Sequence, residues 1–253
     1  MGRLDDETVL VTGASRGLGK SMAQRFAREG ANTVFSARSE NDLMKAASEA
    51  DGETLAVPAD VTDEAAVEAL IETAVDEYGE LTGLVNNAAV GLLSLYDERR
   101  HISEIDADDW RFIMEVNVTG PFLCSKHAIP HLAESDQGRI INISSQGSKR
   151  ASGTNTAYCV SKAGISHLTR SLAAELGSEG VNVNGIMPGP VRTEMMVDVL
   201  DDPEQRQTYL DQMCVDFYGV PEDIGRVAVF LASEDSRYVT GHEVAAEGGW
   251  LVN

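Results

Sequence analysis

A glycine cluster between an apolar run and a helical pattern, close to the start of the chain, constrains the fold more than any other feature. The β-branched, apolar residues 8–11 end at Thr12, and three glycines follow at Gly13, Gly17 and Gly19. A helical pattern continues to Arg28, and another β-branched run begins at residue 33. A strand, a glycine-rich turn, a helix and a second strand within about thirty residues predict one βαβ unit.

The same alternation continues along the rest of the chain. Further apolar runs lie at residues 54–57, 81–85, 139–143, 181–186 and 243–246. Helical patterns lie at residues 62–77, 106–133, 156–177, 203–214 and 221–233. Strands that alternate with helices predict a parallel sheet with helices on both faces, and right-handed crossovers give a doubly wound, Rossmann-like sheet of about seven strands. Since no linker or repeat interrupts the pattern, we expect a single α/β domain over residues 1–253.

The charge of the chain excludes several classes of partner. Its 253 residues include 20 basic and 41 acidic side chains, and the net charge of −21 is spread along the chain. Such a surface disfavours nucleic acid and anionic membranes, so a small molecule is the expected partner. Because the chain opens without a secretory signal and has no long uninterrupted apolar stretch, we expect a cytoplasmic protein. A dense acidic surface also fits a halophile, whose interior is very salty.

Neither the cysteines nor the histidines indicate a metal site. The three cysteines, Cys124, Cys159 and Cys214, are far apart and form no CxxC pair, so we expect reduced thiols. His127 and His131 are four residues apart, but the residues between them lack the glutamate of a zinc-binding helix. We therefore expect no metal cofactor.

The glycine cluster predicts a dinucleotide site. Glycines let the backbone approach a pyrophosphate, which the free N–H groups and the positive end of the following helix then stabilise. The spacing Gly-x3-Gly-x-Gly departs from the general Gly-x-Gly-x2-Gly fingerprint, so the flanking strand and helix support the prediction. An acid at the end of the second strand would favour NAD, but Ala37 stands there beside Arg38, and Arg16 adds a second cation. Two guanidinium groups favour the 2′-phosphate of NADP, so we prefer NADP over NAD.

A second pair of residues, Tyr158 and Lys162, predicts proton transfer. Both lie in the helical pattern of residues 156–177, and a spacing of four places them on one helix face. A phenol with a pKa near 10 exchanges protons poorly at neutral pH, and a fixed neighbouring cation would lower that pKa. Such a pair alone does not identify a catalytic site, and the predicted dinucleotide site supports a catalytic role for it.

Seven short motifs follow one another between Thr12 and Gly249. Beyond the glycine loop they are Asp60-Val61, Asn86-Asn87-Ala88, Val116-Asn117-Val118-Thr119-Gly120, Ile143-Ser144-Ser145, Tyr158-x3-Lys162 and Pro188-Gly189-Pro190-Val191-Arg192-Thr193. In type and order they resemble the motifs of the classical short-chain dehydrogenase/reductases. The resemblance implies an NAD(P)-dependent oxidoreductase whose cofactor site comprises Gly13, Ser15, Arg16, Gly17, Leu18, Gly19, Arg38, Asp60, Val61, Asn87, Ala88, Tyr158, Lys162, Pro188, Gly189, Val191 and Thr193.

The resemblance also implies a role for each group. Asp60 and Val61 would contact the adenine, Asn87 and Ala88 the adenosine ribose, and Val191 and Thr193 the nicotinamide carboxamide. The implied catalytic residues are Asn117, Ser145, Tyr158 and Lys162. Tyr158 would be the acid/base, Lys162 its electrostatic partner, and Asn117 would hold a water that links Lys162 to solvent. Ser145 precedes Tyr158 by the interval usual in the family, so we prefer it to Ser144 as the hydrogen-bond donor to the substrate oxygen.

The implied reaction is hydride transfer between a nicotinamide and a secondary alcohol or its ketone. One candidate substrate is a 3-oxoacyl thioester, which Lys149, Arg150 and the NADP preference support. Another is a sugar or polyol, which the polar loop of residues 96–101 supports. From a different class, a non-catalytic NADP-binding sensor conflicts with the intact catalytic residues. We expect substrate loops near residues 90–106 and 188–218, since ligands bind at the carboxyl ends of such strands.

Four features depart from the family pattern or extend it. Ala89 stands where the family has glycine, and we expect slightly weaker cofactor binding. Residues 92–106 form a longer stretch than is usual. Lys149 and Arg150 are either two solvated cations, which we prefer, or a site for an anionic substrate. The apolar C-terminal residues 250–252 would be odd in water, so we expect a homotetramer with this tail at an interface.

Overall fold

The computed structural model describes the chain apart from residues 1, 97–99, 152–154, 195, 197–200 and 253. In this described part, seven parallel strands form one sheet in the order β3-β2-β1-β4-β5-β6-β7. The strands are β1 Thr8–Thr12, β2 Asn32–Ala37, β3 Thr54–Pro58, β4 Gly83–Asn86, β5 Arg139–Ile143, β6 Asn182–Pro188 and β7 Glu243–Ala246. The strand order reverses between β1 and β4, which creates the crevice where such sheets bind ligands. The predicted single-domain, doubly wound α/β sheet is confirmed.

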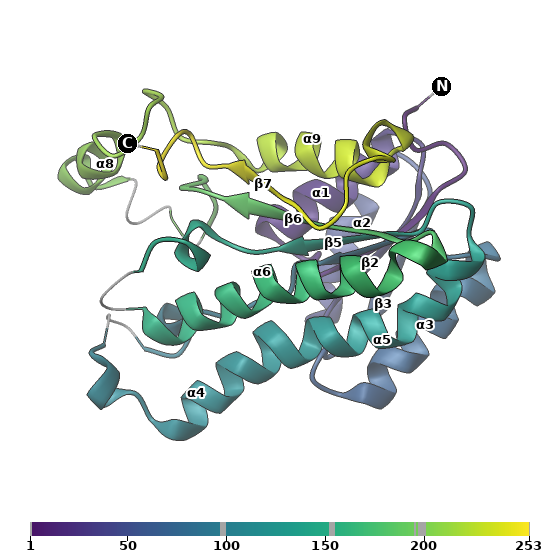
Figure 1. Ribbon diagram of the computed structural model, residues 1–253, viewed down its shortest axis with the longest axis horizontal. Coiled ribbons are helices and arrows are strands. Elements are labelled where there is room, and N and C mark those ends of the chain that lie inside the picture. Colours follow the sequence, from purple (N-terminus) through teal and green to yellow (C-terminus); the bar gives the residue numbers. More distant parts are fainter. Residues whose placement is uncertain (1, 97–99, 152–154, 195, 197–200, 253) are drawn as a thin grey trace.

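Helices cover both faces of the sheet (Figure 1). One face carries α1 Gly17–Arg28, α2 Glu40–Ser48 and α9 Pro221–Ala232, and the other carries α3 Glu64–Tyr78, α5 Gly120–Glu134 and α6 Thr156–Leu176. The helices α4 Ala107–Met114 and α8 Pro203–Leu210 lie toward the carboxyl ends of the strands (Figure 1). Short 3-10 turns are at Leu92–Ser94, Ile102–Glu104, Gln146–Ser148, Gly177–Glu179 and Glu234–Ser236.

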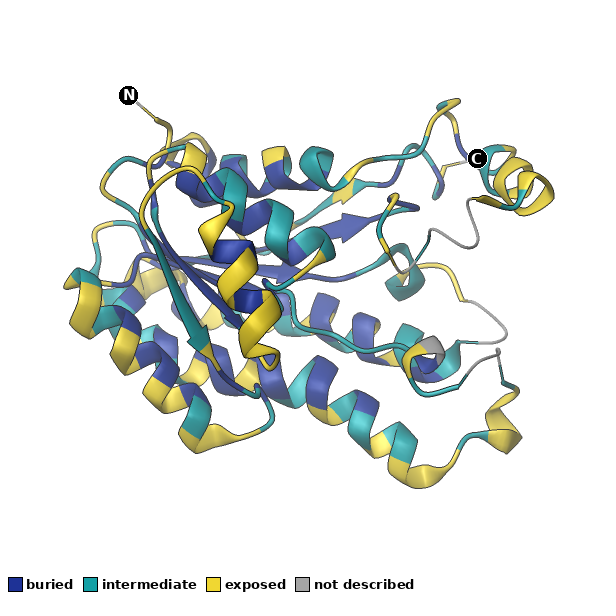
Figure 2. Cartoon of the chain, turned by 180° about the vertical axis from the view of Figure 1, so that it is seen from behind, coloured by how far each residue is buried: buried dark blue, intermediate teal, exposed yellow. Residues whose placement is uncertain are grey.

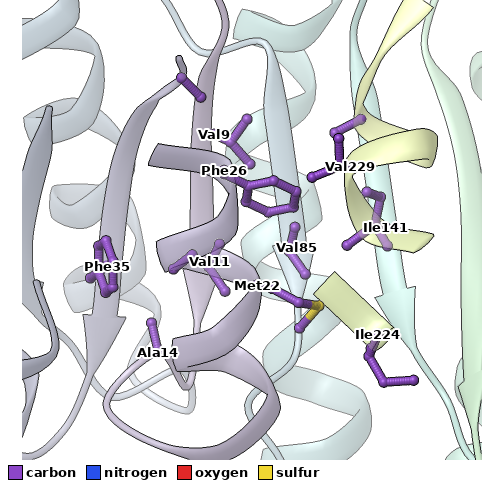
Figure 3. Packing of buried hydrophobic residues seen from close by; sticks show 14 of the residues in the cluster. Val9, Val11, Ala14, Met22, Phe26, Phe35, Val85, Ile141, Ile224 and Val229 are labelled. Atoms are coloured by element: carbon purple, nitrogen blue, oxygen red, sulfur yellow. The ribbon is translucent and has the colours of Figure 1, made fainter. Parts of the chain in front are cut away.

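Two apolar clusters, one on each face, hold these layers together. Figure 3 shows the first, in which Phe26 and Met22 of α1 lie with Val229 and Ile224 of α9 over the strands. All five residues of β1 are buried, as are all five of β5. Figure 2 shows the same pattern, with burial in the strands and in the inner sides of the helices. Central strands buried on both faces are mostly apolar, which is why they gave apolar runs in the sequence, but the buried polar residues Thr12, Arg139 and Asn142 lie within them.

Two local features differ from the sequence-based expectation. The helix α2 had not been anticipated. The helix expected over residues 106–133 is interrupted by a π-helical segment, Glu115–Thr119, which lies between α4 and α5. Single π turns inside helices are frequent at functional sites, and this one contains Asn117.

Candidate active site

The loop after β4 braces the glycine loop after β1. The Thr12 hydroxyl accepts hydrogen bonds from the main-chain N–H groups of Asn87 (3.0 Å) and Ala88 (3.1 Å). In return, the Asn87 amide donates to the carbonyl oxygens of Thr12 (2.9 Å) and Gly13 (3.2 Å). The Asn87 amide nitrogen is thus used to fix the shape of the loop.

Each of the three glycines of this loop is favoured over a larger residue for a different structural reason. A Cβ at Gly13, whose φ is +66°, would lie 2.9 Å from the Ala88 Cα. A Cβ at Gly19 would overlap the Gly13 carbonyl oxygen. Gly17 also has a positive φ, +57°, but a Cβ there would meet no atom within 4 Å. Gly13 and Gly19 therefore allow close packing, whereas Gly17 borders open space at the first residue of α1.

The N-terminus of α1 fits the phosphates of a dinucleotide. Its N-cap residue, Arg16, makes no side-chain capping bond, and its first turn contains no acidic residue. The first N–H groups of a helix have no partner within the helix, and they carry the positive end of its dipole. Of the neighbouring predicted residues, Ser15 is half-buried and Leu18 packs against the core.

The predicted adenosine end of the site lies where β2 and β3 finish. Arg38 is exposed, and its guanidinium is 4.0 Å from one oxygen of Asp60. The other Asp60 oxygen accepts bonds from the N–H and the hydroxyl of Thr62, at 3.0 and 2.8 Å. Val61 is buried and faces Gly120, where a Cβ would lie 2.8 Å from a Val61 methyl group. Arg38 and Arg16 are both exposed side chains, available to a charged ligand.

Tyr158 and Lys162 occupy the first turns of α6, as the spacing predicted. The Lys162 side chain is only 3% exposed, and its Nζ donates to the carbonyl oxygen of Ile143 at 2.8 Å. The same nitrogen lies 5.7 Å from the centre of the Tyr158 ring. Burial lowers the pKa of Lys162 to about 8. Helix α6 therefore holds a largely protonated ammonium group beside the phenol at neutral pH.

The phenol of Tyr158 does not show the lowered pKa that the sequence suggested. Burial raises its pKa, and a hydrogen bond with the Ser145 hydroxyl offsets part of this rise. The direction differs from the expectation because desolvation of the phenolate is the largest influence on this group. The phenol therefore stays protonated at neutral pH.

The two candidate serines have different environments. Ser145 precedes the 3-10 turn Gln146–Ser148, and its hydroxyl oxygen accepts a bond from the Gly147 N–H at 3.1 Å. That contact leaves the hydroxyl hydrogen for another acceptor. Ser144 is buried, and its hydroxyl donates to the Ile186 carbonyl oxygen at 3.3 Å. The structure therefore brings Ser145, and not Ser144, together with Tyr158.

Asn117 is buried in the π-helical segment and joins the loop after β4 to α6. Its amide oxygen accepts from the Val90 N–H, and its amide nitrogen donates to the Val90 carbonyl oxygen, both at 2.8 Å. The same nitrogen donates to the Ser161 hydroxyl at 3.0 Å, and Ser161 donates to the Tyr158 carbonyl oxygen at 2.8 Å. The side chain has used both donors, and its oxygen keeps one lone pair that can accept a bond from the predicted water.

The predicted nicotinamide end follows β6. Gly189 donates its N–H to the Ala246 carbonyl oxygen at 3.0 Å, and a Cβ at Gly189 would lie 2.5 Å from the Glu247 Cα. Val191 is buried and pairs with Gly219 in an isolated parallel bridge. Pro188 is the last residue of β6, and Thr193 is half-buried. Part of the loop expected near 188–218 lies outside the described residues.

The side chains of Arg150 and Trp250 lie together. Arg150 is exposed, and its guanidinium also lies 5.4 Å from the centre of the Trp250 ring. Trp250 is only 7% exposed within a single chain, so its burial requires no partner. Its ring centre is 5.3 Å from that of Tyr209 on α8. Sequence reasoning missed this cluster, since no periodicity links residues that are 41 and 100 positions apart.

The part of the chain that the structure describes contains neither a metal-binding cluster nor a helix that could span a membrane. Within it, no group of three His, Cys, Asp or Glu side chains is arranged to hold a metal ion. His127 instead lies 3.2 Å from Glu64 at the surface, and Lys126 contacts the same carboxylate. None of the described helices combines the length and the apolar character needed to span a bilayer.

Comparison with known proteins gives matches along nearly the whole chain. A family model described as Enoyl-(Acyl carrier protein) reductase matches residues 13–251. Glucose 1-dehydrogenase 2 of Bacillus subtilis is 34% identical over 251 residues, 97% of this chain and 95% of that protein. The 3beta-hydroxysteroid dehydrogenase 1 of Eggerthella lenta is 36% identical over 97% of this chain and 94% of its own. A solved short-chain type dehydrogenase/reductase from Mycobacterium ulcerans has a TM-score of 0.94 at 28% identity and covers 100% of this chain and 92% of its own.

Proposed function

Because the chain belongs to the short-chain dehydrogenase/reductase family, whose members act on CH–OH groups with a nicotinamide cofactor, we propose that it interconverts a secondary alcohol and its ketone. The observation that carries this proposal is the buried ammonium of Lys162 beside the phenol of Tyr158, which is itself hydrogen-bonded to Ser145. The braced glycine loop at the N-terminus of α1 supports a dinucleotide nearby.

The protein side chains divide the proton chemistry among them. A bound nicotinamide supplies or accepts the hydride. In the reducing direction the Ser145 hydroxyl, oriented by the Gly147 N–H, donates to the substrate oxygen. Tyr158 gives its proton to that oxygen, and its raised pKa keeps the proton available at neutral pH. The Lys162 ammonium then stabilises the phenolate, and Asn117 is the proposed holder of the water that returns the proton.

The substrate class has two candidates, each with its own support. A sugar or polyol is supported by the similarity to glucose 1-dehydrogenase 2. An acyl thioester is supported by the description of the matching family model, although that description names an enoyl group and not a 3-oxoacyl group. The contact between Arg150 and Trp250 leaves the guanidinium charged and exposed, so it does not decide between the candidates. A panel of sugars, polyols, steroids and 3-oxoacyl thioesters, followed by the absorbance of the reduced cofactor in both directions, separates the candidates.

We prefer NADP to NAD because of Arg38 and Arg16. Both guanidinium groups are exposed, and the contact between Arg38 and Asp60 is long enough to be replaced by a phosphate. An exposed pair of this kind contributes at most about 1 kcal/mol. The preference is tested by the kcat/KM with NADP divided by the kcat/KM with NAD. Arg38→Ala should lower this ratio. Equal kcat/KM values with NAD and NADP would contradict it.

Assembly, location and salt dependence stay predictions. Trp250 is buried within its own chain, but Val252 of the same tail is 81% exposed and still supports a homotetramer. Further support comes from Phe122 of α5 and Val160 of α6. These apolar side chains are 49% and 42% exposed, on two helices that cover the same face. Light scattering tests the assembly. We also propose a cytoplasmic protein adapted to high salt, on the support of its net charge of −21. The substrate loops near 90–106 and 188–218 likewise stay a proposal.

A further inference from the structure

Trp250 lies between two segments that are distant from it in the sequence. On one side its ring centre is 5.3 Å from that of Tyr209, with an angle of 36° between the ring planes. On the other side the Arg150 guanidinium lies 5.4 Å from the indole centre. Tyr209 belongs to α8, and Arg150 follows the 3-10 turn after Ser145. Among the described residues no ion pair involves Arg150, so the indole is its one recorded side-chain contact.

The C-terminal tail can reach this position because two glycines lie against the segment that follows α8. The N–H groups of Cys214 and Val215 donate to the Gly248 carbonyl oxygen at 2.8 and 3.3 Å. Gly248 and Gly249 have φ values of +67° and +82°. A Cβ at Gly249 would lie 2.5 Å from the Cys214 Cβ. The close approach is therefore fixed by backbone bonds and by the absence of side chains, not by Trp250 alone.

The segments that meet at Trp250 all follow carboxyl ends of strands. Arg150 comes after β5, and its N–H donates to the carbonyl oxygen of Gln146, the residue next to Ser145, at 2.9 Å. Helix α8 comes after β6, and Trp250 comes after β7. Figure 1 and Figure 2 both show the chain end beside α8, beyond the strands on the side where such sheets bind ligands.

We propose that Trp250 is a positioning residue for substrate binding, which acts through Tyr209 and Arg150. The indole fixes α8 relative to the loop that carries Ser145, so the substrate meets a preformed wall beside the catalytic hydroxyl. This inference rests on the proposed function. The proposed groups for the phosphates and the adenosine follow β1 to β4 and have no recorded contact with Trp250. At the proposed nicotinamide end, Gly189 packs against Glu247, whose carbonyl oxygen accepts from the Trp250 N–H at 3.4 Å. This contact is a backbone bond that survives loss of the indole, so that loss should weaken substrate binding and leave cofactor binding nearly unchanged.

The test compares Trp250→Ala and Arg150→Ala with Trp250→Phe, which keeps an aromatic ring, and with Arg237→Ala, which removes an exposed guanidinium outside the proposed site. For the two disruptive variants the KM of the carbonyl substrate should rise about tenfold, because small misplacements near the reacting group have effects of this size or more. Their KM for the dinucleotide should stay within about twofold of the parental value. Trp250→Phe should recover most of the loss, and Arg237→Ala should match the parent.

A second measurement does not depend on activity. Trypsin cleavage after Arg206, within α8, should be faster in Trp250→Ala and Arg150→Ala than in the parent, because the helix has lost its support. If the parent turns over no compound in the panel, the proposed function fails, while the cleavage rates still test the contact. Parental substrate KM and parental cleavage in Arg150→Ala, whose exposed side chain is dispensable for folding, would overturn the proposal. An equal rise of substrate and dinucleotide KM would overturn it as well.

Discussion

Tyr158 is the residue on which the proposed chemistry depends most directly. Its phenol is half-buried and hydrogen-bonded to Ser145, and no other described group near Lys162 is a comparable proton donor. Tyr158→Phe removes the proton without changing the ring, so kcat should fall by about 10²–10⁴-fold, the range of a lost general acid. Steady-state kinetics with binding of the dinucleotide as a control checks this. A variant as fast as the parent would refute the assignment.

The two serines offer a matched pair of substitutions. Ser145→Ala should lower kcat about 10²-fold, because it removes the hydrogen bond to the developing charge on the substrate oxygen. Ser144→Ala removes a bond to the Ile186 carbonyl and should cost about 1 kcal/mol of stability, with kcat within a few-fold of the parent. Kinetics and urea unfolding of both variants separate the two roles. The reverse ranking of kcat would show that Ser144 is the donor.

Lys162 should make the stability of the protein depend on pH in the alkaline range. Burial lowers its pKa to about 8, whereas the unfolded chain has the ordinary value of 10.5. Below pH 8 both states are protonated and the cost of the buried charge is fully present. Between these two values only the unfolded state binds the proton, so the free energy of unfolding rises with pH.

The matching experiment uses Lys162→Met, which keeps the length of the side chain without the charge. From pH 7 to pH 10 the parent should gain ~2 kcal/mol relative to this variant, since one unit of pKa shift corresponds to about 1.4 kcal/mol. Urea unfolding at both pH values measures the difference. If the parent lost stability relative to Lys162→Met over this range, the lowered pKa of the buried Lys162 would be contradicted.

At the scale of elements, substitutions at two positions of the glycine loop should affect dinucleotide binding and protein stability separately. Gly17→Ala places a methyl group in open space at the N-terminus of α1, at a strain of roughly 1 kcal/mol for its positive φ. The affinity for the dinucleotide should fall at least about tenfold, because the methyl group occupies the expected path of the phosphates. Gly19→Ala instead overlaps the Gly13 carbonyl and should cost roughly 3 kcal/mol of stability.

Fluorescence titration with the reduced dinucleotide and urea unfolding measure these two effects. Gly17 and Gly19 are two residues apart, yet the first is expected to matter for ligand binding and the second for packing. If Gly17→Ala bound the dinucleotide as tightly as the parent, the ligand would lie elsewhere and the proposed site would be wrong.

The elements themselves were accessible from the sequence because their signals are local. The strands β5 and β7 have the expected bounds, and the other strands differ from them by two residues or fewer. Buried parallel strands give continuous apolar runs, although residues 227–232 of α9 form a similar run. Helix α2 was missed because it is only nine residues long, although its buried residues Leu43, Ala46 and Ala47 have helical spacing. The π-helical segment was missed because its residues are compatible with either helix.

The site was accessible only in part. Tyr158 and Lys162 are one helical turn apart, so their proximity follows from the spacing. The bonds from Asn117 to Val90, and from Asn87 to the glycine loop, join residues 27 and 75 positions apart, and no periodicity reports such contacts. The contact of Arg150 with Trp250 is equally non-local, because it joins residues 100 positions apart.

At the scale of the whole molecule, the charge balance predicts that salt stabilises the protein. Acidic side chains exceed basic ones by 41 − 20 = 21, and the Debye length falls from about 10 Å at 0.1 M salt to about 3 Å at 1 M. Salt also screens exposed ion pairs such as Lys20–Glu49, but each contributes at most about 1 kcal/mol. Repulsion among the uncompensated carboxylates is the larger effect, so its relief should dominate.

We therefore expect Tm to rise by about 4–8 °C between 0.1 M and 2 M KCl, which corresponds to a gain of ~2 kcal/mol for a chain of this size. Thermal unfolding across a KCl series measures it. Sucrose at matched osmolality is the control, because it acts through exclusion from the surface and leaves the charges unscreened. A gain with KCl but a smaller gain with sucrose identifies charge repulsion as the cause. Maximum stability in dilute buffer would show instead that the ion pairs outweigh the excess of acidic groups.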